Sequence, residues 1–102
     1  MALVTQNVTM IKLFGNKETE KIYLGKVSKK YPPEIQQLAR RKLKMLHASQ
    51  NLKDLRIPPA NRLEKLRGTL SSYHSIRVNQ QWRIIFIWYE NDALDVQLVD
   101  YH

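Results

Sequence analysis

Hydrophobic and polar residues alternate along residues 73–102, and no other part of the chain sustains a two-residue period. Because successive side chains of a strand point to opposite faces, this period predicts strands with one buried face and one polar face. We place these strands at about 74–79, 81–89 and 93–100. The large apolar residues expected on the buried face are all even-numbered: Ile76, Val78, Trp82, Ile84, Phe86, Trp88, Leu94, Val96 and Leu98.

The strand over 81–89 is expected in the middle of the sheet. Ile85 and Ile87 interrupt its alternation, as happens when a strand is covered on both faces. Glu90-Asn91-Asp92 predicts the turn into the last strand, since Asn and Asp tolerate left-handed backbone. The three strands would therefore form an antiparallel meander.

The first half of the chain carries two helical patterns after a short apolar strand at 10–14. Asn16 is expected to cap the first helix, which would stop near Lys30. Pro32-Pro33-Glu34 predicts the start of the second helix, because proline suits the first helical turn. Its apolar positions follow helical spacing: Ile35, Leu38, Ala39, Leu43 and Leu46.

Residues 49–57 predict a connector with one turn of helix near 52–55, and Pro58-Pro59 forces the chain to extend after it. A further strand is expected over 61–67, ending at Gly68. The predicted order is β-α-α-β-β-β-β. This is an α+β fold in which two N-terminal helices pack on one face of a small, twisted, mainly antiparallel sheet.

Composition limits the function classes. The chain has 102 residues, enough for a single domain over 1–102, with 1–9 as an N-terminal extension. It has no cysteine, and its three histidines lack metal-ligand spacing, so we expect no metal and no cofactor. No segment resembles a membrane span or a signal peptide, and we expect a cytoplasmic protein. The net charge of +8 favours a polyanion or an acidic partner over a merely basic solvated surface.

A run of cations on the second helix, Arg40, Arg41, Lys42 and Lys44, has two interpretations. A solvated helix face is the commoner one. The other is a surface for an acidic protein or for RNA phosphates. We expect His47 at the surface or the helix end, and His74 in a structural position or at the rim of the sheet.

The polar face of the predicted sheet carries groups suited to RNA cleavage. Arg77 and Arg83 lie on it, and the last strand ends in Asp100-Tyr101-His102. Arginine forks match phosphate oxygens, and histidine transfers protons near neutral pH. An ordinary solvated sheet face with scattered arginines would show the same pattern.

Three stretches add a resemblance: RLEKLRG (62–68), YHSIRVNQQWRIIFIW (73–88) and the terminal VDYH (99–102). Together they resemble the HigB group of host-inhibition toxins in the RelE/ParE superfamily, over about residues 10–102. The resemblance implies a RelE-like fold and a toxin of a type II toxin–antitoxin system. The implied activity is ribosome-dependent cleavage of mRNA in the A site, by metal-independent attack of the RNA 2′-hydroxyl, which inhibits translation.

The resemblance also implies roles for particular residues. His102 would transfer protons, with Tyr101 assisting or stacking on a base. Arg83 and Arg67 would stabilise the phosphorane, and Asp100 would orient His102 or hold the terminal segment. Which group is the acid and which the base stays open. The residues expected to contact RNA are Arg62, Glu64, Arg77 and Asn79.

The chain departs from one branch of that family at two positions. The branch has a histidine where this chain has Glu64, so Glu64 is either a base or a structural residue. It has an arginine where this chain has Asn79, and Arg77 on the same face is expected to supply that charge.

The implied partners are a cognate helix-turn-helix antitoxin of the HigA type, the ribosome and mRNA, with operator DNA reached only through the antitoxin and no membrane. Two other functions stay open. One is a ParE-like inhibitor of DNA gyrase on the same fold, and the other is a non-catalytic nucleic-acid-binding module. The terminal Tyr101-His102 favours cleavage.

Overall fold

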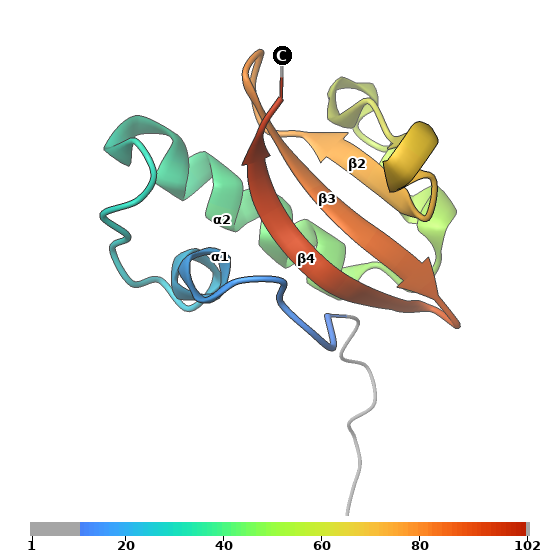
Figure 1. Ribbon diagram of the computed structural model, residues 1–102, viewed down its shortest axis with the longest axis horizontal. Coiled ribbons are helices and arrows are strands. Elements are labelled where there is room, and N and C mark those ends of the chain that lie inside the picture. Colours follow the sequence, from blue (N-terminus) through green and yellow to red (C-terminus); the bar gives the residue numbers. More distant parts are fainter. Residues whose placement is uncertain (1–10, 102) are drawn as a thin grey trace, which may run out of the picture.

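A four-stranded antiparallel sheet with strand order β1-β2-β3-β4 forms one layer, and two α-helices pack on one of its faces (Figure 1). The computed structural model describes residues 11–101, so the expectations for residues 1–10 and for His102 lie outside the described residues. The elements in chain order are α1 (Lys17–Tyr23), α2 (Pro33–Ala48), η2 (Leu52–Arg56), η3 (Pro59–Asn61), β1 (Glu64–Lys65), η4 (Gly68–Leu70), β2 (Tyr73–Arg77), β3 (Trp82–Tyr89) and β4 (Asp92–Asp100), where η marks a 3-10 helix. The predicted α+β fold is confirmed, with β3 between β2 and β4.

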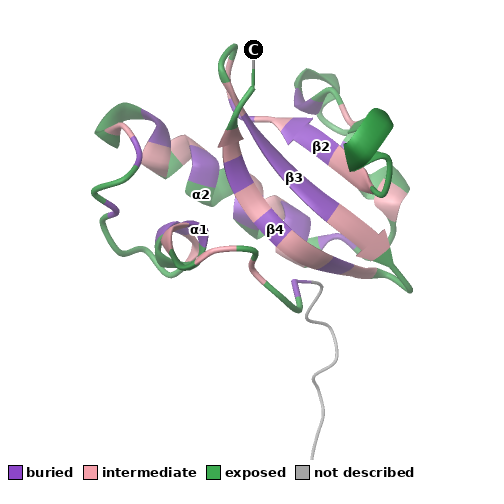
Figure 2. Ribbon diagram, viewed as in Figure 1, coloured by how far each residue is buried: buried purple, intermediate pink, exposed green. Residues whose placement is uncertain are grey.

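The even-numbered side chains of the meander form the core, as the alternation predicted. Ile84 and Phe86 of β3 are fully buried, and so is Val96 of β4 (Figure 2). They pack against the apolar stripe of α2, whose buried residues are Ile35, Ala39, Leu43 and Leu46. Burying this stripe stabilises the helix against the sheet, since each fully buried aliphatic side chain contributes about 1.5–3 kcal/mol.

The prediction for Leu94 was wrong because β4 contains a bulge. Ile85 pairs with Gln97 while Ile87 pairs with Leu94, so β4 holds one more residue than β3 over this interval. Asp95 has a positive φ of 53° within the bulge. The extra residue inverts the alternation, and before the bulge it is Ala93 that is fully buried.

The expected strand at 10–14 is reduced to two isolated bridges where the structure describes it. Ile11 bridges to Ala93 and Phe14 to Val96, both in parallel orientation. The amide of Gly15 donates to the Val96 carbonyl (2.8 Å), and the amide of Val96 donates to the Leu13 carbonyl (3.0 Å). This segment therefore lies along the outer edge of β4.

The first helix begins where predicted but ends earlier. The Asn16 carboxamide accepts a hydrogen bond from the Thr19 amide (2.8 Å), which makes it the N-cap. The helix stops at Tyr23 rather than near Lys30, because Gly25 adopts a left-handed backbone with φ of 82°. The amides of Gly25 and Lys26 donate to the carbonyls of Ile22 (3.0 Å) and Lys21 (2.8 Å), which is a Schellman motif.

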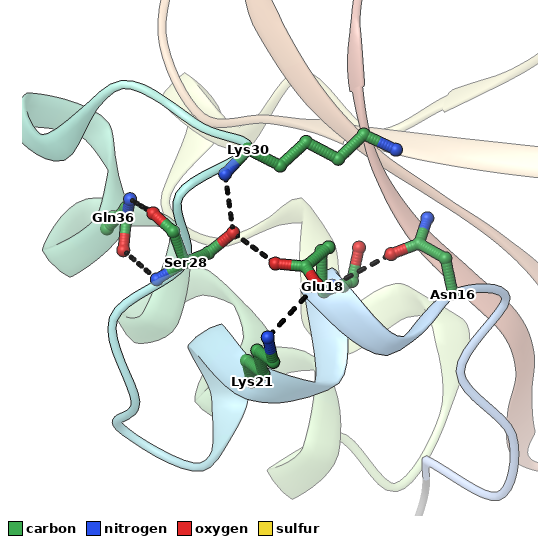
Figure 3. A network of polar contacts seen from close by, with 7 residues as sticks. Asn16, Glu18, Lys21, Ser28, Lys30 and Gln36 are labelled. Atoms are coloured by element: carbon green, nitrogen blue, oxygen red, sulfur yellow. Dashed lines mark hydrogen bonds and ion pairs between the residues drawn. The ribbon is translucent and has the colours of Figure 1, made fainter.

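A polar network centred on Ser28 fixes the link between the two helices (Figure 3). The Ser28 hydroxyl donates to Glu18 (2.6 Å) and accepts from the Lys30 amide (3.1 Å). The Gln36 carboxamide accepts from the Ser28 amide (3.0 Å) and donates to its carbonyl (2.7 Å). The hydrogen bond from Ser28 and the ion pair with Lys21 lower the pKa of Glu18. The link is thus tied to the first turn of α1 through Glu18 and to the start of α2 through Gln36.

Three of the four cations on α2 have partners within the chain. The Arg40 guanidinium donates to the Tyr23 carbonyl (3.3 Å), and the Lys44 ammonium lies 5.1 Å from the centre of the Tyr23 ring. The Lys42 ammonium donates to the side-chain oxygen of Asn61 (2.6 Å), and burial lowers the pKa of Lys42. Only Arg41 remains without a partner among the described residues, which favours a mainly structural role for this run.

The prediction of a strand over 61–67 was wrong about its length. Only Glu64–Lys65 pair with β2, and Asn61 is a fully buried member of η3. Its side chain accepts from Lys42 and donates to the Leu55 carbonyl (3.0 Å). Arg62 follows with a left-handed φ of 47°, which separates Asn61 from the strand.

Candidate functional site

The face of the sheet turned away from the helices gathers the predicted arginines. Arg77 and Arg83 are direct partners on β2 and β3. Tyr101 follows β4, and its amide donates to the Gln81 carbonyl (2.6 Å), which holds the end of the chain beside the β2–β3 turn. The register of the meander therefore brings Arg77, Arg83 and Tyr101 to one end of one face, as the sequence predicted.

Arg83 lies at this end of the open face but is buried, with only 7% of its surface exposed. One guanidinium nitrogen donates to the Arg62 carbonyl (2.6 Å) and lies 3.7 Å from a carboxylate oxygen of Glu64. The guanidinium carbon lies 5.4 Å from the centre of the Tyr101 ring, a cation–π contact. Arg83 thus connects β1, β3 and the segment after β4.

The charge of Arg83 is held in a poorly solvated position. Burial lowers its pKa, and the neighbouring cations Arg77 and Arg62 add to this, while Glu64 and Tyr101 act in the opposite direction. Its Nε is buried without a partner among the described residues. Because arginine stays protonated throughout the physiological range, the site contains a fixed positive charge in a low-dielectric setting.

An open cleft of about 620 Å³ is lined in part by the two side chains, Glu64 and Tyr101, that contact Arg83. Its lining comprises Glu64, Lys65, Leu66, Arg67, Leu70 and Tyr101. The Glu64 side chain is 48% exposed and Tyr101 is 41% exposed, and Arg67 is exposed as well. Three predicted residues, Glu64, Arg67 and Tyr101, therefore line one cleft, and Arg83 contacts two of them.

Other predicted residues lie outside the cleft lining. Asp100 accepts a hydrogen bond from the Gln81 side chain (3.0 Å) and pairs with Trp82. The Asn79 side chain accepts from the amides of Gln81 and Trp82 (2.8 Å each), so it stabilises the β2–β3 turn. Arg77 donates to the Asn79 carbonyl (3.1 Å). Arg62 is exposed and gives its carbonyl to Arg83. The predicted role of His102 falls outside the described residues.

Lys65, Leu66 and Leu70 line the cleft but were not predicted to belong to the site. They flank Glu64 and Arg67 in the sequence, so proximity along the chain was the available signal. Alternation misled here because β1 has only two residues, and on either side of it the chain does not follow the two-residue period. The η4 turn then brings Leu70 back to the cleft.

Within residues 11–101 no cluster of three or more His, Cys, Asp or Glu side chains is arranged to hold a metal ion. The helices of this described part are also too short or too polar to cross a membrane.

Two helices followed by a four-stranded antiparallel sheet, with a basic cleft on its open face, define an α+β protein of the RelE-like class. Residues 5–102 match the model of a family described as the RelE-like toxin of type II toxin–antitoxin system HigB. The chain therefore belongs to this HigB-like toxin family. A toxin of such a system has an antitoxin as its partner.

Relatives support the assignment. The chain is 49% identical to Toxin HigB-1 of Vibrio cholerae over 67 residues, which cover 66% of this chain and 70% of the relative. It is also 42% identical to an uncharacterized protein of Haemophilus influenzae over 78 residues, which cover 76% of each chain.

Proposed function

We propose that the chain is a ribosome-dependent mRNA endonuclease, which cleaves mRNA in the ribosomal A site and so inhibits translation. Membership of the family supports a function as a toxin, and one structural observation supports RNA cleavage as its activity. Buried Arg83 contacts Glu64 and Tyr101, and these two residues line an open cleft together with Arg67. Such a cleft offers fixed positive charge beside groups able to transfer protons.

The proposed reaction uses the RNA's own 2′-hydroxyl as the nucleophile. Its oxygen attacks the adjacent phosphorus while the 2′ proton passes to a base. The bond from phosphorus to the 5′-oxygen breaks, and that oxygen takes a proton from an acid. The products are a 2′,3′-cyclic phosphate and a 5′-hydroxyl. This route needs no metal, because protein groups supply both proton transfers and the stabilising charge.

Arg67 and Arg83 have complementary roles in this proposal. Arg67 is exposed at the cleft and is free to form charge-assisted hydrogen bonds with the scissile phosphate. Arg83 is buried, and this burial strengthens its field at the cleft, since charges interact more strongly where water is excluded. Arg83 also fixes Tyr101 through the cation–π contact.

Glu64, Tyr101 and His102 are the proposed proton-transfer groups. Both Glu64 and Tyr101 line the cleft. Glu64 belongs to β1, the first strand of the sheet, and Tyr101 follows β4, the last strand. His102 is the next residue in the chain and keeps the role that the resemblance implies. Asp100 is proposed to hold this terminal segment through Gln81.

Three further residues are proposed to guide RNA. Arg62 and Arg77 carry charge at the edge of the site. Asn79 acts through the turn that positions Arg77, because its carbonyl accepts from that guanidinium. The proposed partners are a helix-turn-helix antitoxin of the HigA type, the ribosome and mRNA, with operator DNA reached through the antitoxin. Residues 1–102 are proposed to act as one domain in the cytoplasm.

The chemistry can be tested with the purified chain, programmed ribosomes and an end-labelled mRNA. We expect fragments with a 5′-hydroxyl and a 2′,3′-cyclic phosphate, formed only when ribosomes are present. Fragments with a 5′-phosphate would indicate water rather than the 2′-hydroxyl as nucleophile and would contradict the mechanism. If no RNA is cleaved while DNA gyrase is inhibited, the gyrase function replaces the proposal.

A further inference from the structure

A second pocket, separate from the cleft, lies beside β1 and has a volume of about 410 Å³. We call it the η2 pocket, and its lining comprises Leu52, Lys53, Arg56, Leu63, Lys65 and His74. Three of these residues come from η2, two from around β1 and one from β2. The proposed nuclease chemistry uses none of them, yet Lys65 lines both this pocket and the cleft.

The charge of the η2 pocket is positive and uncompensated. Lys53 and Arg56 are exposed and form no ion pair within residues 11–101. Asp54 lies between them in the sequence, but its carboxylate accepts from the amides of Gln50 (2.9 Å) and Asn51 (3.3 Å). The acid thus completes the capping box at the start of η2. The two cations are left available to an anion.

One wall of the η2 pocket is apolar or aromatic. The His74 ring stacks near Phe86, with centroids 6.2 Å apart and an angle of 22° between planes. Burial lowers the pKa of His74 and Lys65 lowers it further, so the ring is neutral at neutral pH. Together with Leu52 and Leu63, it provides a surface that fits the ribose or base beside a phosphate.

We propose that the η2 pocket binds a phosphate of RNA, with Lys53 and Arg56 as its ligands. This inference rests on the proposed function and extends its RNA-binding surface beyond the cleft. Lys65 lines both hollows, so a strand held in the cleft continues across β1 into the η2 pocket. This continuity favours RNA over an acidic protein segment. The phosphate belongs either to the mRNA or to ribosomal RNA, since both present the same chemistry.

A double variant, Lys53→Ala with Arg56→Ala, tests the pocket directly. Both side chains are exposed, and the Asn51–Asp54 capping box of η2 is untouched, so the fold should be retained. The matched control is Lys26→Ala with Lys29→Ala, which removes the same charge from the exposed link after α1. Circular dichroism and thermal unfolding of all three proteins verify that they are folded.

The first arm measures binding of a fluorescent single-stranded RNA oligonucleotide across a range of salt concentrations. The second measures binding to purified ribosomes carrying mRNA. We expect the double variant to lose about tenfold in affinity relative to the control in at least one arm, as two charge-assisted phosphate contacts would give. If the pocket holds an mRNA phosphate, the slope of log K against log salt in the oligonucleotide arm should become shallower by about 1.4, since each lost contact removes about 0.7 for single strands.

The arms separate the sources of the phosphate. Loss in both arms places an mRNA phosphate in the η2 pocket, and loss with ribosomes alone places a ribosomal RNA phosphate there. Equal binding by the double variant and the control in both arms overturns the proposal. Weakened antitoxin binding with unchanged RNA and ribosome binding overturns it in favour of an acidic protein segment. If the wild-type chain cleaves mRNA and the double variant matches the control, the pocket proposal alone fails.

Discussion

Arg83 is the buried residue that connects three parts of the proposed site. Its guanidinium contacts the Arg62 carbonyl, the Glu64 carboxylate and the Tyr101 ring at once. One nitrogen reaches both oxygens while the planar group lies over the ring, an arrangement that the shorter reach and point charge of an ammonium group would not reproduce. The residue therefore fixes the relative positions of Glu64 and Tyr101 as well as supplying charge.

Arg83→Lys keeps the positive charge but loses the fork. We expect mRNA cleavage on programmed ribosomes to fall by at least about tenfold in kcat, because Glu64 and Tyr101 are no longer held together. Arg77→Lys, a neighbouring substitution of the same kind, should change kcat much less. Equal activity of Arg83→Lys and the wild-type chain would show that charge alone suffices at this position.

Asn61 is the buried residue whose loss should matter most for folding outside the apolar core. Asn61→Ala leaves the Leu55 carbonyl and the Lys42 ammonium without their partner. We expect the free energy of unfolding in urea to fall by about 1–3 kcal/mol. Gln80→Ala, on an exposed turn, should stay within about 0.5 kcal/mol of the wild type. A similar small effect for both variants would contradict the role assigned to Asn61.

His74 should make stability depend on pH. Burial holds its pKa in the folded state below the value of about 6.5 expected in the unfolded chain. The unfolded state therefore binds the proton more readily, and stability is full above about pH 6.5 and is lost as the pH falls towards the folded pKa. His74→Phe preserves stacking near Phe86 but removes this titration. The fall in Tm between about pH 7 and pH 5 should be smaller in the variant, and an unchanged fall would contradict the assignment.

At the scale of elements, alternation and capping predicted the core well because they act locally. Ile76, Ile84 and Phe86 of β2 and β3 are buried, with Trp82 and Trp88 partly buried against the same core. Asn16 caps α1, and α2 starts at Pro33 as expected. The errors arise where one residue changes the backbone direction. Gly25 ends α1, and Asp95 sits in the bulge that inverts the alternation of β4. Neither conformation follows from the hydrophobic pattern. The Gly25 cap is made by local backbone hydrogen bonds, and the bulge at Asp95 depends on the pairing of β4 with β3.

The same distinction applies to the site. The sequence predicted Arg77 and Arg83 on one face of the sheet, with the segment around Tyr101 beside them. Strand parity and register determine these positions. It did not predict that Arg83 would be buried or that Lys65 would line two hollows. Those properties come from the path of the chain around η3, β1 and η4, where the segments are too short to show a period.

Gly25 offers a test at the element scale. Gly25→Ala places a Cβ on a residue with φ of 82°, and its nearest neighbour is the flexible end of Arg40 at 3.2 Å. The cost is therefore mainly backbone strain, and we expect the free energy of unfolding to fall by about 1 kcal/mol. Lys26→Ala, the next residue, should change it by less than about 0.5 kcal/mol. If Gly25→Ala were neutral in urea unfolding, the Schellman motif would not be what ends α1.

At the scale of the whole molecule, the hydrophobic core and the proposed site lie on different faces of the sheet. The helices cover one face of the sheet and bury the core (Figure 1). The cleft is lined by β1, the η4 region and Tyr101, and two of its residues contact Arg83. In the proposed function the net charge of +8 attracts RNA, and the cleft and the η2 pocket are where we propose that the RNA binds. We propose that this surface cleaves mRNA on the ribosome.

The most direct measurement of that claim maps the 5′ ends of cellular mRNA at nucleotide resolution after induction. Wild type would be compared with Arg67→Ala and His102→Ala, and coexpressed antitoxin would verify that each variant still binds its partner. We expect new ends in phase with the reading frame for the wild-type chain and none for either variant. Growth arrest by the wild-type chain without new ends would contradict the account and make DNA gyrase the next target to test.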